Sequence, residues 1–362
     1  MVDWSAAHSG EMRWMSGLAV IVLCASIVAF VVGGAAGVPV ASIYLGYVRT
    51  ILIVGPVALI AIALACIPIA IARGTKLPLT EGSRHLARRI GSADAALGTL
   101  GPIFLIPLFM GAFGTFKQIM PRIAPFAWDD TFAEAGRVLF FGYRPWQLTH
   151  ALFGGAGQTA IIDAIYFAWL PTLFLTVFAM AILAPPALRA RFFVSFVTAW
   201  LLLGVIAAYL LSSAGPVYAS MVGANSDFSP LIEKLHSSGG DNAVFGTLRW
   251  QKELWSAYSQ QRYSFGYGIS AMPSLHNAIA FLYALCAWRG GIWARTAASA
   301  FAGAILLGSV HLGWHYIADG LVAWAGMYAI WRGAGAYLRW CGYEQNDMQE
   351  PVGAPGPEAL AT

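Results

Sequence analysis

Apolar stretches about as long as a membrane is thick recur along the whole chain. A helix needs about 20 predominantly apolar residues to cross the hydrocarbon core of a bilayer. Eight such stretches are present, at about 15–36, 50–72, 94–115, 160–184, 191–212, 274–289, 296–314 and 316–335. Because hydrocarbon offers no hydrogen-bond partners, spans of this kind form helices. The pattern predicts an all-α fold, a polytopic membrane helical bundle of about eight transmembrane helices.

The composition agrees with this class. The chain has 362 residues, of which 59% are hydrophobic and 10% are charged, and its mean hydropathy is +0.67. Soluble domains carry roughly 25% charged residues. The four cysteines have neither the spacing of a disulfide framework nor that of a metal site. These features exclude a soluble disulfide-rich protein and give no sign of a bound metal or cofactor.

The positions of lysine and arginine predict the orientation in the membrane. With a cytoplasmic N-terminus, 12 of the 21 basic residues fall in cytoplasmic segments. Eight of the other nine lie in two long loops, about 116–158 and 213–269, and the short outside loop near 37–49 contains only Arg49. The positive-inside rule counts short loops. We therefore expect both termini to be cytoplasmic and both long loops to be extracytoplasmic.

The two long loops are rich in aromatic residues, proline and glycine, as in Pro125–Trp128 and Phe140–Trp146. Aromatic side chains favour the headgroup layer of a membrane. Amphipathic helices that lie in this layer would account for them. The sequence thus predicts interfacial helices in both extracytoplasmic loops.

Two short stretches place ionisable side chains where predicted spans begin: Met272-Pro273-Ser274-Leu275-His276 and His315-Tyr316-Ile317-Ala318-Asp319. His315 and Asp319 are four residues apart and therefore share one face of a helix. A carboxylate beside an imidazole fixes its tautomer and stabilises its protonated form. Because ionisable groups at membrane depth are costly, they tend to mark function.

Each of these features has a structural interpretation when taken alone. Ser274 can cap a helix, although a capped N-terminus is also an anion site. Lys117, where the third span ends, can mark the membrane edge. Asp163, early in the fourth span, must pair or face a cavity. The combination of lysine and two histidine motifs on one membrane face favours phosphoryl transfer.

In this order the three motifs resemble those of the type 2 phosphatidic acid phosphatase and vanadium haloperoxidase superfamily, over about residues 100–335. The second and third motifs and the stretch Lys117–Trp146 look most like its inositolphosphotransferase branch, which includes inositol phosphorylceramide synthase. The resemblance implies a six-helix catalytic core with its site at the extracytoplasmic surface. It also implies that His315 is the nucleophile that forms a phosphohistidine, that Asp319 orients it, and that His276 is the general acid and base.

The resemblance is incomplete in the groups that bind phosphate. The superfamily's first motif is a lysine, six residues, then Arg-Pro, and counting from Lys117 gives Ala124-Pro125. Arg122 is a candidate substitute for the missing arginine. A second register, from Arg137 to Arg144-Pro145, restores Arg-Pro but lacks the lysine. We favour the register that starts at Lys117, because Lys117 lies where the third predicted span ends, as the motif requires.

In the superfamily an arginine stands six residues before the nucleophile, and this position is Ser309 here. The nearby residue that could carry a positive charge in its place is His311, one turn before His315. The predicted phosphate-binding residues are Lys117, Arg122, Ser274 and Arg144. This predicted phosphate site has fewer cationic side chains than that of the phosphatases. The difference suggests a substrate other than simple phosphatidic acid.

Three regions follow from these observations. Residues 1–92 are expected to hold two N-terminal transmembrane helices and a basic cytoplasmic loop. Residues 93–340 form the catalytic membrane domain, and 341–362 form a polar, disordered cytoplasmic tail. We expect a multi-pass protein of the plasma (inner) membrane with its active site on the extracytoplasmic face.

The predicted function is transfer of a phospho-headgroup, similar to inositol phosphate, from a phospholipid to a second lipid alcohol. The partners are then a phospholipid donor, a lipid alcohol acceptor and the bilayer, with no nucleic acid, no cofactor and no metal. One alternative is a lipid phosphate phosphatase that uses water as acceptor. An alternative of another class is a proton- or metal-coupled transporter with a path through His276, His311, His315, Asp319 and Asp163.

Overall fold

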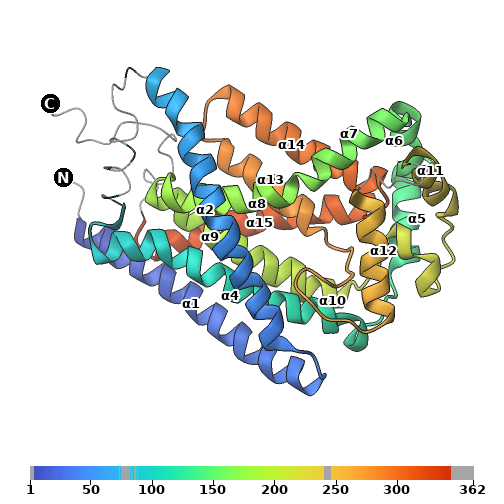
Figure 1. Ribbon diagram of the computed structural model, residues 1–362, viewed down its shortest axis with the longest axis horizontal. Helices are drawn as coiled ribbons and strands as arrows, with labels where there is room; N and C mark the ends of the chain where they lie inside the picture. The colour runs from blue at the N-terminus through green and yellow to red at the C-terminus, as the bar shows by residue number, and fades with distance from the viewer. Residues whose placement is uncertain are drawn as a thin grey trace.

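A computed structural model describes residues 4–343, apart from 73, 75–81, 83, 85, 86, 88 and 240–245. Within this part of the chain the secondary structure is helical, with no strand. Figure 1 shows long helices packed side by side in a bundle. These are α1 (Trp4–Ala35), α2 (Val40–Ala72), α4 (Ala93–Ile123), α7 (Ala156–Phe167), α8 (Trp169–Ile182), α9 (Pro186–Leu201), α13 (Leu275–Ala287), α14 (Ile292–His311) and α15 (Ile317–Trp340).

Shorter helices occupy the two predicted loops and the end of α9. They are α5 (Asp129–Leu139), α6 (Pro145–Phe153), the π-helix η1 (Leu202–Ala207), α10 (Ala208–Leu210), the 3₁₀ turns η2 (Pro216–Tyr218) and η3 (Ser220–Val222), α11 (Ser229–Gly239) and α12 (Gly246–Ser259). In α5 the apolar residues Phe132 and Ala133 are buried, whereas Glu134 and Arg137 are exposed. This helix has the amphipathic pattern expected of the loops.

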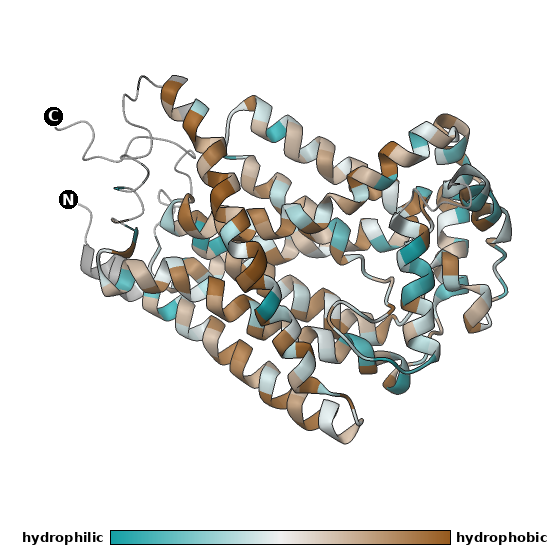
Figure 2. Cartoon of the chain, viewed as in Figure 1, coloured by the Kyte–Doolittle hydropathy of each residue, from teal (hydrophilic) through white to brown (hydrophobic). Residues whose placement is uncertain are grey.

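The predicted all-α polytopic bundle is confirmed. Among the described residues, six helical segments are long and apolar enough to cross a membrane: Gly10–Ala35, Val40–Pro68, Ala93–Ile123, Ala156–Ile182, Pro186–Leu210 and Ile292–His311. The other two predicted spans are also helices, the short α13 and the less apolar α15. Figure 2 shows that hydrophobic residues dominate α1, α2 and α4.

Local sequence sets several helix boundaries. The Ser92 side chain accepts a hydrogen bond from the Ala95 N–H and begins α4, as expected of an N-cap serine. Pro145 and Pro186 stand at the first position of α6 and α9, where a missing N–H costs nothing. The α4 helix ends later than the predicted span, at Ile123 rather than near 115.

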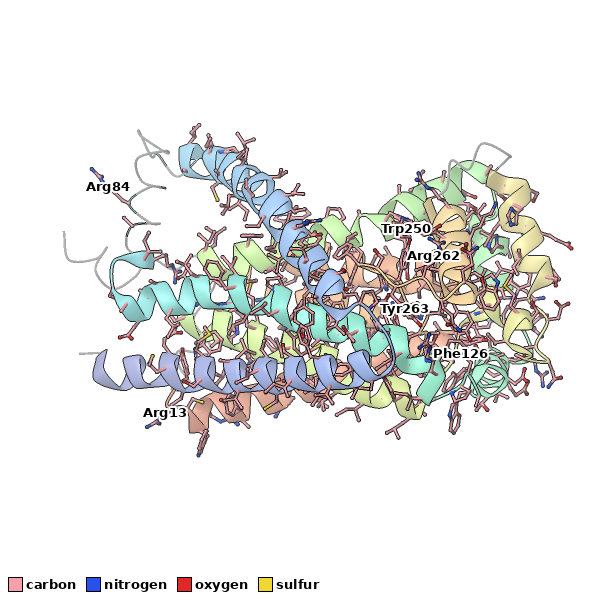
Figure 3. The ribbon with its side chains drawn as sticks, turned by 60° about the horizontal axis from the view of Figure 1, so that its bottom comes forward. Arg13, Arg84, Phe126, Trp250, Arg262 and Tyr263 are labelled. Atoms are coloured by element: carbon pink, nitrogen blue, oxygen red, sulfur yellow. The ribbon has the colours of Figure 1, made fainter. Side chains whose placement is uncertain are left out.

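The bundle has two distinct ends. A Cβ on Gly10 of α1 would lie 3.3 Å from the Cys341 carbonyl oxygen, so α1 begins where α15 ends. The short helices α5, α6, α11 and α12 gather at the other end (Figure 1). Arg13 lies far from Phe126 and Arg262 (Figure 3). The described residues thus place the start of α1 and the end of α15 opposite the two long loops, and the side of the membrane that each end faces remains a prediction.

The core lies around α9, whose Phe192, Phe193 and Phe196 are all buried. Near the terminal end, the buried Arg189 of α9 and the partly buried Glu11 of α1 form an ion pair at 2.7 Å. The domain boundaries remain predictions. Residues 344–362 of the expected tail and most of the basic loop lie outside the described residues.

Candidate active site

His315 lies just before α15, next to the carboxylate that the sequence pairs with it. Its Nδ1 is 3.2 Å from Oδ2 of Asp319, and the same oxygen accepts the Tyr316 backbone N–H at 3.0 Å. The Asp319 side chain is fully buried and His315 is 6% exposed. Asp319 therefore holds the first turn of α15 and the imidazole together, and Nε2 of His315 is not used by this contact.

The backbone before His315 is held by the end of α14. The N–H groups of Trp314 and His315 both donate to the Ser309 carbonyl at 3.0 Å. Ser309 is the position that carries arginine in the superfamily, and here its Oγ accepts a bond from Asn277 Nδ2 at 3.2 Å. Ser309 therefore supports the turn that carries His315 instead of supplying charge.

Ser274 joins the two histidine motifs. It is the N-cap of α13, and its Oγ accepts bonds from the N–H and the side-chain amide of Asn277. Its own backbone N–H donates to the Asp319 carbonyl at 3.2 Å. Because the Ser274 side chain is fully buried, the cap interpretation accounts for its contacts in this structure.

His276 lies in the first turn of α13 among aromatic rings. Its ring centroid is 4.2 Å from that of Trp169, 5.1 Å from that of Tyr166 and 6.0 Å from that of His315. Lys117 of α4 is close enough to His276 to interact with it electrostatically. The structure thus brings together five of the predicted residues, Lys117 of α4, Ser274 and His276 at the start of α13, and His315 and Asp319 at the start of α15.

Arg144 reaches the site from the other side. A pocket formed by Phe132, Trp146 and Phe228 is also lined by Arg144 and His315. The Arg144 Nη1 donates to the Asp227 carbonyl at 2.6 Å, and the guanidinium lies 4.6 Å from the centre of the Phe228 ring. The second motif register therefore also places a cation in the pocket that His315 lines.

Arg122 is placed elsewhere. Its Nη1 donates to the Ala36 carbonyl at 2.8 Å, and its Nη2 bonds Gln261 and the Tyr263 hydroxyl. These partners belong to the turn after α1 and to the loop before α13. Lys117 lies within α4 rather than at its end, because the helix continues to Ile123.

A second carboxylate, Asp129, anchors Tyr316, the residue that follows His315. Asp129 is 3% exposed and accepts bonds from the Gly215 N–H at 2.8 Å and the Tyr316 hydroxyl at 2.9 Å. Burial raises the pKa of Asp129. Asp129 lies within the stretch Lys117–Trp146 that resembles the family, but the sequence did not indicate this role.

Gly215 is required at this contact. Its φ is +100°, a conformation that residues with a Cβ rarely adopt. A Cβ there would lie 2.6 Å from the Trp314 carbonyl oxygen. The loop that binds Asp129 can therefore press directly against the segment that carries His315.

The other polar residues named for a transport path have structural partners. Asp163 accepts the N–H groups of Gly246 and Thr247 at 2.8 and 3.1 Å and so caps α12. His311 stacks on His150, with ring centroids 3.8 Å apart. Across the residues described, no group of three or more His, Cys, Asp or Glu side chains is arranged to hold a metal ion.

Comparison with known families agrees with this geometry. The family model described as the PAP2 superfamily matches residues 131–332, more than half of the chain. The chain belongs to the PAP2 superfamily. Membership supports an integral membrane enzyme with phosphatase or phosphotransferase activity. The PAP2 match contains both histidine motifs and Arg144, whereas Lys117 precedes it. Comparisons with curated proteins and with solved structures found no significant match.

Proposed function

We propose that this PAP2 protein transfers a phospho-headgroup, similar to inositol phosphate, from a phospholipid to a second lipid alcohol through a phosphohistidine. The observation that carries the proposal is the pairing of His315 Nδ1 with the buried Asp319 carboxylate. This pairing leaves Nε2 as the nucleophile and stabilises the charge that the ring gains when it bonds to phosphorus.

In the first step, His315 Nε2 attacks the donor's phosphorus as the bond from phosphorus to the lipid alcohol oxygen breaks. His276, 6.0 Å away between ring centroids, gives its proton to the departing oxygen. In the second step, His276 takes the proton of the acceptor hydroxyl, whose oxygen attacks phosphorus. The phosphorus–nitrogen bond breaks, and both imidazoles return to their starting forms.

Charge on the phosphoryl oxygens must be held through both steps. Lys117 beside His276 and Arg144 beside His315 are the cations that the geometry offers for this role. The N-termini of α13 and α15 add partial positive charge on the same side. Arg122, whose contacts lie elsewhere, is not assigned to the phosphate.

The second candidate, a lipid phosphate phosphatase, uses the same residues with water as the acceptor. The apolar surroundings favour transfer to a lipid. Phe132, Trp146 and Phe228 line the pocket beside His315, and Trp169 and Tyr166 cover His276. A site that limits water protects a phosphohistidine from hydrolysis.

The proposed site faces the extracytoplasmic side of the plasma (inner) membrane, with both termini in the cytoplasm. The separation of Arg13 from the aromatic loop residue Phe126 supports this orientation (Figure 3). The basic residues would then be enriched on the cytoplasmic side in the short loops that determine topology.

The test uses purified protein with phosphatidylinositol that carries labelled phosphorus, with and without ceramide. Transfer of label to a new lipid only when ceramide is present supports the transferase. Release of water-soluble label regardless of ceramide supports the phosphatase instead. His315→Ala and His276→Ala should abolish turnover in folded protein, and normal activity in either variant would overturn the assignment.

Inhibitors separate this mechanism from metal chemistry. Vanadate adopts the geometry of a phosphoryl group in transfer and should inhibit the protein, whereas EDTA should have no effect. Loss of activity with EDTA would contradict the proposal and support a metal-dependent reaction.

A further inference from the structure

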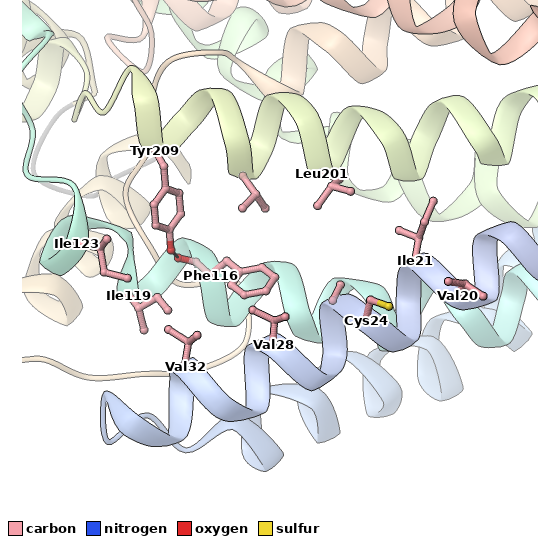
Figure 4. Close-up of a pocket in the computed structure, with 12 residues that line it drawn as sticks. Val20, Ile21, Cys24, Val28, Val32, Phe116, Ile119, Ile123, Leu201 and Tyr209 are labelled. Atoms are coloured by element: carbon pink, nitrogen blue, oxygen red, sulfur yellow. Dashed lines mark hydrogen bonds between the residues drawn. The ribbon is translucent and has the colours of Figure 1, made fainter. Parts of the chain in front are cut away.

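An apolar groove is lined by none of the residues assigned to the candidate active site. It runs between α1 and the α9–α10 segment, with α4 as its floor (Figure 4). Its volume is about 530 Å³. The one hydroxyl among its lining side chains, that of Tyr209, donates to the Phe116 carbonyl at 2.7 Å. The groove therefore presents hydrocarbon along its whole length.

The groove follows one half of the membrane. On α1 it extends from Val20 to Val32, which is about 18 Å at the helical rise of 1.5 Å per residue. The hydrocarbon of one leaflet is about 15 Å deep, half of the full core. Because most of these α1 residues lie in the second half of the Gly10–Ala35 span, the groove lies mainly in the leaflet on the side of the active site.

The helices around the groove diverge for identifiable reasons. At the terminal end, the Glu11–Arg189 ion pair holds α1 against α9. Farther along, α9 passes into the π-helix Leu202–Ala207, which contributes Val205 to the groove wall. A π-helix within an α-helical segment is uncommon and often accompanies a functional feature.

A cation stands at the end of the groove nearest the site. Arg122 precedes the lining residue Ile123, and its Nη1 bonds the Ala36 carbonyl, one turn beyond Val32. Arg122 is exposed. Its bonds to Ala36, Gln261 and Tyr263 use three of the five guanidinium donors. The other two, one on Nε and one on Nη1, have no partner within the described part of the chain.

We propose that this groove binds one acyl chain of a phospholipid from the site-side leaflet, with the lipid phosphate on Arg122. The apolar walls match the chain, the length matches the leaflet, and the free guanidinium donors match a phosphate at headgroup level. The site stands apart from the catalytic histidines. It does not depend on the proposed function, and a His315→Ala variant should bind the lipid equally well.

The first experiment measures lipid bound to purified protein by native mass spectrometry, with palmitoyl-oleoyl phosphatidylglycerol as the probe. Val28→Trp fills the groove, whereas Val31→Trp places the same ring on the neighbouring exposed face of α1, which does not line it. We expect wild type and Val31→Trp to retain one lipid and Val28→Trp to lose it. Equal retention in both variants would overturn the proposal.

The headgroup contact has its own matched pair. Arg122→Gln should bind phosphatidylglycerol about tenfold more weakly, as expected for one lost charge-assisted hydrogen bond. Arg49→Gln, on exposed α2 surface outside the groove, should bind it normally. An unchanged affinity in Arg122→Gln would refute the assignment of the phosphate.

A third experiment uses the wild-type chain, so that its outcome does not depend on the folding of a variant. Cys24 lines the groove, whereas Cys66 lies on α2 outside it. In delipidated protein, phosphatidylglycerol should slow the modification of Cys24 by N-ethylmaleimide and leave Cys66 unaffected. If both cysteines are protected equally, the lipid coats the protein without occupying the groove, and the proposal fails.

Discussion

Replacing Asp319 by asparagine tests the proposed chemistry with minimal change in shape. Asp319 Oδ2 binds both His315 Nδ1 and the Tyr316 N–H, while Oδ1 has no hydrogen-bond partner among the described residues. If the amide oxygen replaces Oδ2, both bonds survive but the negative charge is lost. If the amide nitrogen faces these donors instead, the imidazole proton must move to Nε2, which then cannot attack phosphorus.

The size of the effect follows from the distance. An imidazolium and a carboxylate 3.2 Å apart attract each other by about 5 kcal/mol at an effective dielectric constant near 20. Because each 1.36 kcal/mol changes a rate tenfold, complete loss corresponds to about 10⁴-fold. The amide dipole retains part of this attraction, so we expect kcat to fall by about 10²- to 10⁴-fold with little change in KM.

The assay is steady-state turnover in lipid nanodiscs, together with thermal unfolding of each variant. Asp163→Asn is the matched control, because Asp163 is also a buried carboxylate that accepts two backbone N–H groups but caps α12. It should leave kcat within a few-fold of wild type. If Asp319→Asn keeps a kcat within threefold of the control, or if it unfolds the protein, the orienting role is refuted.

Three further predictions rest on neighbouring contacts. Tyr316→Phe removes the hydroxyl that binds Asp129 and should lower kcat more than KM; an unchanged kcat would show that this bond does not position His315. Arg144→Ala should lower kcat/KM by about tenfold or more, as expected for a lost charged hydrogen bond. Arg137 is exposed and paired with Glu134, so Arg137→Ala should leave kcat/KM unchanged. Equal effects of the two substitutions would contradict the assignment of Arg144 to the phosphate. Burial lowers the pKa of His150 below 6.5, so the unfolded state binds more protons below about pH 6.5 and stability declines as pH falls through this window. His150→Gln should flatten that decline in melting temperature, and an unchanged profile would exclude His150 as its source.

The helices and the two histidine motifs were predictable because their signals are local. Apolar runs determine a span wherever they occur, and Ser274 and Asp319 act within one turn of the histidines that they support. The resemblance to the PAP2 motifs depended on the same short segments. The family match confirmed the superfamily, while the inositolphosphotransferase branch remains part of the proposal.

Contacts between distant segments were not predictable in this way. Asp129 and Tyr316 are 187 residues apart, and Asp163 meets Gly246 across 83 residues. Nothing in the local sequence distinguishes a buried aspartate that binds a distant backbone from one at the surface. The predicted end of α4, near residue 115, was also wrong, because the helix continues to Ile123. Its last turns carry Lys117 and Arg122, and charged residues after an apolar run indicated a loop.

The 6.0 Å spacing of the His276 and His315 rings has a stereochemical consequence. In the proposed mechanism one imidazole attacks phosphorus while the other serves the oxygen on the opposite side, so each displacement is in line and inverts the phosphorus centre. The acceptor then enters from the side that the donor alcohol left, and the second inversion cancels the first. A donor made chiral at phosphorus with oxygen isotopes should therefore yield product of retained configuration, whereas direct transfer between the two lipids would yield the mirror-image arrangement.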